Sequence, residues 1–274
     1  MEVNILLKES ESLNKKMHKT TFAIAKHLFE VHGYLKIENL FAKELIQKLA
    51  SALLGNLELN KEEMTLNQGT EVAYRRYILN VPFTSPFNDA DLYANPLLLS
   101  LMKAFLGEHF IMSSLGCVIS LPGATDQHVH ADYFPLFEES PHLTGSHPPF
   151  AITIAIPLVD IDLINGPTKI WRGSHRTYPI DQKMRSYSMD MLYGPVGSCY
   201  FWDYRTFHAG GSNFSEELRP LLYFSYTRRW FRDSLNPDRL NMEEKEYEKI
   251  SNEHRKLFPS AGHSSESRSL LLSS

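Results

Sequence analysis

Apolar residues in the first hundred positions recur every three or four residues, the spacing expected of helices with one buried face. The clearest stripe contains Ile24 and Leu28, and Gly33 is well placed to end it. Asn95 and Pro96 are typical of the cap and the first position of a later helix. Together these patterns predict three helices, over residues 10–32, 45–54 and 96–106.

After residue 108 the pattern changes to short runs rich in β-branched and aromatic residues, separated by clusters such as Asn165-Gly166-Pro167. The runs predict strands over residues 109–121, 150–158, 197–201 and 221–226, with two earlier strands at 34–37 and 74–81. A helical front followed by many short strands favours an α+β, mainly β fold. We expect an antiparallel double-sheet roll with the helices packed outside it.

Length and composition are those of one globular domain, which we expect to span residues 1–258. A Ser-rich flexible tail is predicted at 259–274, an irregular insertion at 134–149 that would overhang the candidate site, and a charged, mostly exposed helix at 242–256. The net charge of -4 gives no electrostatic case for binding nucleic acid or an anionic membrane. Cys117 and Cys199 do not form a disulfide framework, and the chain has neither an N-terminal apolar run nor a membrane-spanning one. These features predict a reduced, cytoplasmic protein.

The candidate chemistry begins with His130 and Asp132, which are two residues apart. On a strand, residues at this spacing point to the same face, so an imidazole and a carboxylate would converge. His208 is the best third ligand, because two histidines and one carboxylate form the facial triad of non-haem Fe(II) oxygenases. Two alternatives stay open: the pair is also typical of a polar strand end, and His128 on the same face is another possible ligand.

A metal site that activates O2 needs an electron source, and a chelating 2-oxo acid is one such source. Arg219 lies eleven residues after His208, and a planar guanidinium is suited to hold the far carboxylate of such an acid. A surface pairing of Arg219 with Glu217 is the alternative. Thr153 and Gln127 are further candidates for contact with the cosubstrate, unless they are a buried threonine and a strand cap.

Several segments resemble, in the same order, motifs of the phytanoyl-CoA dioxygenase family of Fe(II)/2-oxoglutarate oxygenases. The segment 127–132 resembles its Q-x-x-H-x-D, Asn165-Gly166-Pro167 followed by Gly173-Ser174-His175 resembles its N-G-P…P-G-S-H, and the segment 208–215 with Arg219 resembles its H-x-G-x-x-N-x-S…R. The resemblance runs from about residue 20 to 230. The chain departs from the family pattern at Trp171-Arg172, before Gly-Ser-His, and at Ser198, where an acidic residue is common.

The resemblance implies a double-stranded β-helix, also called a jelly roll or cupin-like fold. It implies that His130, Asp132 and His208 bind Fe(II), that Arg219 holds 2-oxoglutarate, and that O2 is the second cosubstrate. The expected reaction oxidises a C–H bond of a small molecule, a secondary metabolite or an acyl derivative, and releases succinate and CO2. Two other functions stay open, a cupin-type metalloenzyme without a 2-oxo acid and a non-catalytic binding module. The sequence predicts no oligomeric state.

Overall fold

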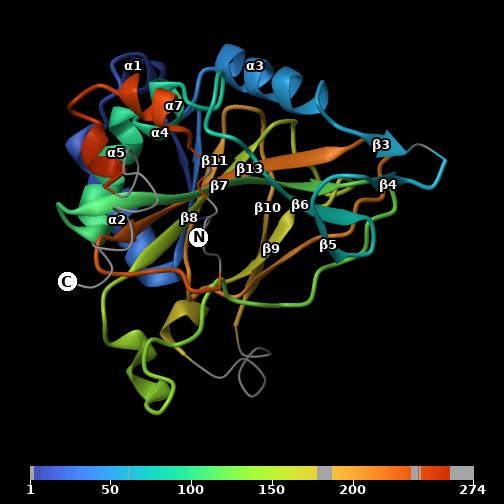
Figure 1. Ribbon diagram of the computed structural model, residues 1–274. Coiled ribbons are helices and arrows are strands. Elements are labelled where there is room, and N and C mark those ends of the chain that lie inside the picture. Colours follow the sequence, from blue (N-terminus) through green and yellow to red (C-terminus); the bar gives the residue numbers. More distant parts are fainter. Residues whose placement is uncertain (1–2, 61, 178–186, 236–239, 241, 260–274) are drawn as a thin grey trace.

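A large, mostly antiparallel sheet forms the centre of the computed structural model, which describes residues 3–60, 62–177, 187–235, 240 and 242–259. Only the pair β1–β2 at one edge is parallel. The predicted antiparallel β core is therefore confirmed (Figure 1). In order across the sheet the strands are β1 (Asn4–Leu6), β2 (Tyr34–Glu38), β11 (Cys199–Asp203), β8 (Ala151–Pro157), β13 (Arg219–Arg228), β7 (Phe110–Ser120), β6 (Arg76–Asn80) and β5 (Thr70–Ala73).

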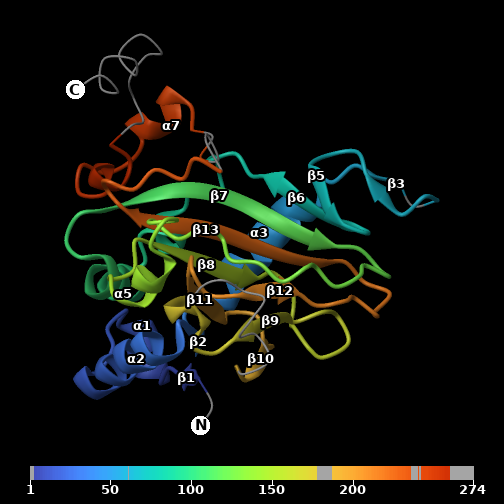
Figure 2. The same cartoon turned by 90° about the horizontal axis from the view of Figure 1, so that it is seen from below.

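Two smaller sheets complete the strand structure. The first has the order β10 (Met189–Leu192), β9 (Thr168–Trp171) and β12 (His208–Gly210), and the second pairs β3 (Leu59–Asn60) with β4 (Thr65–Leu66). In Figure 1 helix α3 lies above the large sheet and β9 lies below it, while Figure 2 shows α1 and α2 beside the β1–β2 edge. The two faces of the large sheet are thus covered by different elements.

The helices are amphipathic and pack their apolar residues onto the core, as in α5, where Leu98 and Leu101 are fully buried. Asn95 caps α5 as predicted, because its side chain accepts a hydrogen bond from the backbone N–H of Leu97 at 3.0 Å. None of the helices in the described part is long and apolar enough to cross a membrane. The helices are α1 (Glu9–Leu13), α2 (Lys19–His32), α3 (Lys43–Leu54), α4 (Ala90–Tyr93), α5 (Pro96–Leu106) and α7 (Glu244–Glu248), with 3-10 turns at Pro141–Gly145, Ser174–Arg176 and Arg255–Leu257.

The first predicted helix, over residues 10–32, is wrong in one respect, because the structure breaks it into α1 and α2. The carboxylate of Glu11 accepts hydrogen bonds from the backbone N–H groups of Lys8 and His18, and Lys15 takes a positive φ of 49°. A buried side chain that bonds the backbone on both sides of a turn competes with helix continuation. The break is therefore a local capping effect.

Two other predicted elements also need correction. The strand expected at 74–81 is β6, but it begins only at Arg76, because Arg75, with φ 58°, lies in a turn that joins β6 to β5, a strand that the sequence did not predict. The helix expected at 242–256 is shorter than predicted, because α7 covers only Glu244–Glu248. The segment is mostly exposed as expected, although Glu246 is buried and accepts a hydrogen bond from Asn88 at 2.7 Å. Apart from residue 259, the predicted tail lies outside the described residues.

The register of the large sheet places selected side chains in rows on one face, because directly paired residues of neighbouring strands point the same way. One row contains Arg76, Ser120 and Arg219. A second, apolar row contains Ile78, Val118 and Leu221, and a third contains Ser114, Ser225, Thr153 and Trp202. All of these residues except Ser120 line one cavity, which β9 and β12 of the three-stranded sheet also line through Thr168, His208 and Gly210.

Candidate metal centre

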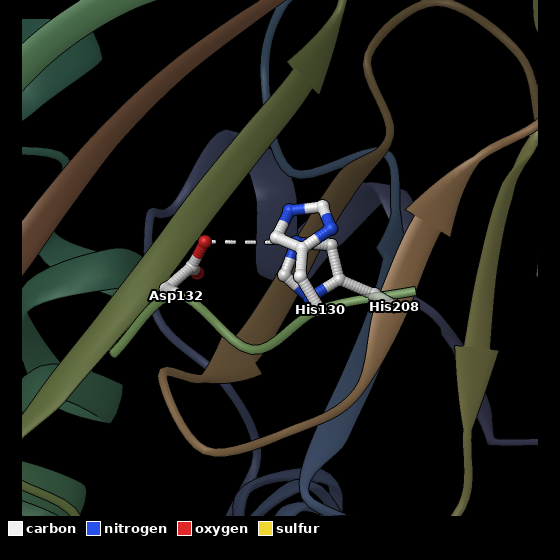
Figure 3. Close-up of side chains that lie close together, drawn as sticks. All are labelled: His130, Asp132 and His208. Carbon is white, nitrogen blue, oxygen red and sulfur yellow. Dashed lines mark ion pairs between the residues drawn. The ribbon is translucent and has the colours of Figure 1, made fainter. Parts of the chain in front are cut away.

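His130, Asp132 and His208 converge at one point in this cavity, as Figure 3 shows. One ligand atom from each residue lies within 4.8 Å of the other two. The segment around His130 is not a full strand, but His130 and His208 pair through two backbone hydrogen bonds of 3.0 and 2.8 Å. The backbone N–H of Asp132 donates to the carbonyl of Tyr204 at 2.8 Å, which fixes the carboxylate beside the two rings.

Both imidazoles are held in the tautomer that a metal requires. Nδ1 of His130 lies 2.9 Å from the carbonyl oxygen of His128, and Nδ1 of His208 lies 3.0 Å from that of Thr206. Because a carbonyl only accepts hydrogen bonds, each Nδ1 carries the proton and each Nε2 presents a lone pair. Burial, with a further contribution from nearby His208, lowers the pKa of His130 to about 4, so this ring is neutral at pH 7.

The carboxylate of Asp132 has two unequal oxygens. Oδ2 accepts hydrogen bonds from Oγ1 of Thr153 at 2.6 Å and from Nε1 of Trp202 at 2.8 Å. Oδ1 lies 3.6 Å from Nε2 of His208. Two neutral imidazole nitrogens and one carboxylate oxygen are the donor set that suits a divalent first-row metal, so the residues fit a non-haem iron.

Two buried guanidiniums lie elsewhere in the same cavity. Arg219 is only 2% exposed, and its Nε and Nη2 have no hydrogen-bond partner among the residues that the structure describes. The predicted alternative of a surface pairing with Glu217 does not occur within the described residues. Burial lowers the pKa of Arg219 to about 10, which leaves it protonated at pH 7. A buried cation with unpaired hydrogen-bond donors is suited to bind an anion.

The second guanidinium, Arg76, was not among the residues that the sequence singled out. It is completely buried, and within the described residues it donates to three neutral oxygens, those of Ser120, Thr125 and Gly211, at 2.5, 3.2 and 2.6 Å. Burial first, and then the charge of Arg219, lower its pKa to about 9. The available signal was its place two residues before Ile78 on an alternating strand, which puts a charge on an inward face.

The other candidate residues lie as follows. Gln127 lines the cavity, and its Oε1 accepts from the backbone N–H of Gly210 at 3.1 Å. Thr153 also lines the cavity, and its hydroxyl donates to Asp132 as described above. His128 is exposed and lies outside the converging triad, with its ring centroid 5.2 Å from that of His130.

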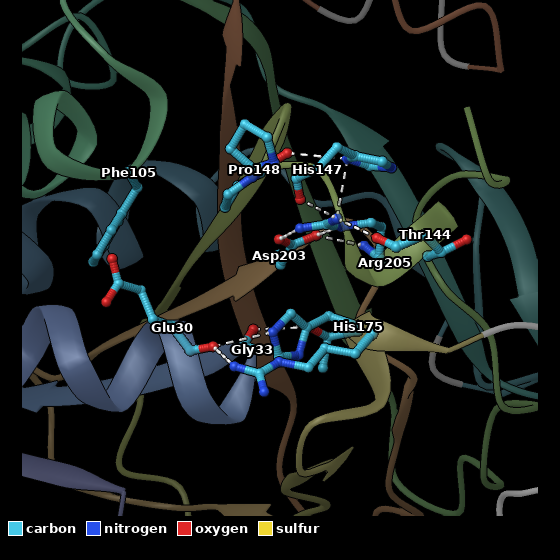
Figure 4. A network of polar contacts seen from close by, with 12 residues as sticks. Glu30, Gly33, Phe105, Thr144, His147, Pro148, His175, Asp203 and Arg205 are labelled. Atoms are coloured by element: carbon cyan, nitrogen blue, oxygen red, sulfur yellow. Dashed lines mark hydrogen bonds and ion pairs between the residues drawn. The ribbon is translucent and has the colours of Figure 1, made fainter. Parts of the chain in front are cut away.

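The insertion over residues 134–149 does not overhang the metal ligands as expected, since none of its residues lines the cavity. It is fastened instead to a buried ion pair between Asp203 and Arg205, shown in Figure 4. Nη1 of Arg205 donates to the carbonyl oxygens of Thr144 and His147 at 2.6 and 2.9 Å. The expectation was wrong because the insertion has its own anchor away from the cavity.

This combination of sheet, ligands and buried cations is that of the non-haem iron enzymes that use 2-oxoglutarate, with Fe(II), 2-oxoglutarate and O2 as their cofactor and cosubstrates. A sequence comparison gives the particular family. The model of a family described as phytanoyl-CoA dioxygenase (PhyH) matches residues 29–221, and the chain therefore belongs to the phytanoyl-CoA dioxygenase family.

Several solved structures have a similar fold. The α-ketoglutarate-dependent epimerase SnoN from nogalamycin biosynthesis is 17% identical with a TM-score of 0.61, covering 77% of this chain and 82% of SnoN. The carbocyclase SnoK from the same biosynthesis is 15% identical with a TM-score of 0.58, covering 79% and 85%. AviO1 from Streptomyces viridochromogenes Tue57 is 18% identical with a TM-score of 0.59, covering 79% and 99%.

Proposed function

We propose that the chain is an Fe(II)- and 2-oxoglutarate-dependent dioxygenase that oxidises a C–H bond of a small molecule, releasing succinate and CO2. The observation that carries the proposal is the pairing of His130, Asp132 and His208 with the unpaired guanidinium of Arg219 in one cavity. The proposal includes a double-stranded β-helix as the single domain of residues 1–258. It also includes a cytoplasmic location, which the two free, buried cysteines support.

In this proposal His130, Asp132 and His208 hold the iron, and Arg219 holds the far carboxylate of 2-oxoglutarate. Arg76 adds positive charge beside Arg219 on the same row of the sheet. The apolar row of Ile78, Val118 and Leu221 would contact the methylene groups of the cosubstrate. Gln127 and Thr153 remain candidates for contact with the cosubstrate, and both line the cavity.

Bound Fe(II) with 2-oxoglutarate and O2 supplies the oxidising power for attack on an unactivated C–H bond. The residues of the chain contribute position and environment. The two histidines keep their protons on Nδ1 and so present lone pairs from Nε2, and Arg219 orients an acid by two parallel hydrogen bonds. Burial of His208 and Arg219 keeps water from competing for their hydrogen bonds.

The substrate is proposed to be a small molecule of the kind made in secondary metabolism. SnoN and SnoK, which share this fold, belong to nogalamycin biosynthesis, and SnoN has been solved with Fe3+, α-ketoglutarate and nogalamycin RO. The remaining part of the cavity lining contains Tyr204, Tyr223 and Asp233, so it combines aromatic surface with polar groups. An acyl derivative is the second candidate.

The first experiment adds Fe(II) and 2-oxoglutarate to the apoprotein without oxygen and records the weak visible charge-transfer band of the chelate. We expect the band in the native protein, and succinate after oxygen is admitted, with both lost in Asp132→Ala. Asp91→Ala, which removes an exposed carboxylate remote from the triad, is the matched control and should behave as the native protein. Absence of the band in native protein, or normal succinate formation by Asp132→Ala, would exclude this function.

A further inference from the structure

The two donors to Asp132 are a directly paired couple in the large sheet. Trp202 of β11 and Thr153 of β8 are opposite one another in the register, so their side chains leave the same face. Both are buried, with exposed fractions of 5% and 6%. The loop that carries Asp132 crosses over this pair, and one carboxylate oxygen, Oδ2, accepts from both.

This arrangement makes the two oxygens of Asp132 inequivalent before any metal binds. An oxygen that accepts two hydrogen bonds of 2.6 and 2.8 Å has both lone pairs engaged. The other oxygen, Oδ1, is the one that faces Nε2 of His208 at 3.6 Å. The backbone N–H of Asp132 is also held, by the carbonyl of Tyr204, so the loop presents the carboxylate to the two donors from a fixed position.

Trp202 also contacts a second candidate ligand. Its ring centroid lies 4.9 Å from that of His208, with 43° between the ring planes. The same side chain therefore limits the positions of both a carboxylate and an imidazole that come from different parts of the chain. Hydrogen-bond partners of metal ligands orient those ligands and tune their affinity for the metal.

We infer that Trp202 and Thr153 are positioning residues that commit Asp132 to bind metal through Oδ1 alone. This rests on the proposed metal site, and it goes further by assigning two residues that do not themselves bind metal. A carboxylate held to one oxygen occupies one coordination position, and a carboxylate free to use both oxygens would occupy two. The cross-strand pair thus protects a position that the cosubstrates need.

The test measures Mn(II) affinity of the apoprotein by titration, with no 2-oxoglutarate and no substrate present. We expect Trp202→Phe and Thr153→Val each to weaken Mn(II) binding by about 10-fold, and the double variant by up to about 100-fold. Thr153→Ser keeps the hydroxyl and should restore native affinity. With Fe(II) and 2-oxoglutarate added without oxygen, the charge-transfer band of the double variant should shift or weaken.

Two matched controls remove buried hydroxyls that have no hydrogen-bond partner among the described residues. Tyr200→Phe changes a residue on β11, the strand of Trp202, and Thr227→Val changes a residue on β13, which pairs with the strand of Thr153. Both controls should bind Mn(II) within twofold of the native protein. If Trp202→Phe does not fold, the Thr153→Val and Thr153→Ser pair decides the question alone.

The outcomes separate this inference from the proposed function. Mn(II) affinity of the double variant within twofold of native protein overturns the positioning role and leaves the oxygenase proposal intact. Native protein that binds Mn(II) but gives no charge-transfer band with Fe(II) and 2-oxoglutarate overturns the oxygenase proposal and leaves the positioning role intact. Native protein that binds no metal overturns both.

Discussion

Two buried arginines of this protein have opposite surroundings. Arg205 is 5% exposed, and its Nε and Nη2 donate hydrogen bonds to the two carboxylate oxygens of Asp203 at 2.8 and 2.6 Å. Its Nη1 donates to nearby backbone carbonyl oxygens. Arg219, 2% exposed, finds no partner for Nε and Nη2 in the described part of the chain, and its charged neighbour is another guanidinium, Arg76. The first guanidinium has its charge balanced inside the fold, and the second does not.

The difference indicates which arginine serves structure and which serves binding. A buried charge without a partner lowers stability, so a protein is expected to retain one where a ligand supplies the missing charge. Arg205 needs no ligand and ties the insertion at 134–149 to the sheet. Arg219 lies in the cavity of the metal triad, where an anionic cosubstrate would complete its hydrogen bonds. The same substitution at the two positions should therefore give opposite results.

Arg205→Met is expected to have the largest effect on stability, because it leaves the carboxylate of Asp203 buried and unpaired. Breaking one side of a buried ion pair typically costs about 3–5 kcal/mol in the free energy of unfolding. Denaturant unfolding followed by circular dichroism measures this loss. The double variant Asp203→Asn with Arg205→Met should recover part of the loss, and a single variant as stable as native protein would contradict the structural role.

Arg219→Met is expected to spare stability and to weaken cosubstrate binding. Removing a desolvated guanidinium with unpaired donors also relieves its repulsion from Arg76, so the free energy of unfolding should stay level or rise. Two charge-assisted hydrogen bonds to a carboxylate are lost, which should raise the dissociation constant of 2-oxoglutarate by about 100-fold. Anaerobic titration of the charge-transfer band measures that constant. A loss of stability as large as that of Arg205→Met would remove the distinction between the two arginines.

The sequence predicted those parts of the site that a local pattern or a family motif specifies. His130 and Asp132 are neighbours along the chain, and the segment from His208 to Arg219 resembles one motif, so both could be found without coordinates. His130, Asp132 and His208 converge in the structure as predicted. Their roles as metal ligands, and the roles assigned to Arg219, Gln127 and Thr153, remain proposals.

Other features depend on register and long-range contacts, and the sequence could not give them. Arg76 lies beside Arg219 because β6 and β13 both pair with β7, and it donates a hydrogen bond to Gly211, 135 residues later. The donation from Trp202 to Asp132 follows from a pairing with Thr153 that no spacing along the chain reveals. The placement of 134–149 was wrong for the same reason, because its anchor, Arg205, lies about 60 residues further on.

Substitution of His175 is expected to have the smallest effect of the three on the protein. It tests whether the region around Arg205 makes the free energy of unfolding depend on acid pH. The ring of His175 is buried near Asp203, Arg205 and Arg176, and burial is the main cause that lowers its pKa from 6.5 to about 4. Between these values the unfolded chain binds a proton that the folded chain does not, so stability falls as the pH falls. From pH 7 to pH 5 this group lowers the free energy of unfolding by about 2 kcal/mol.

His175→Gln, which cannot titrate, should lower the pH dependence of the unfolding free energy by that amount, whereas Asp91→Ala should not. Equal pH dependence in His175→Gln and native protein would show that another group near Arg205 carries the acid sensitivity.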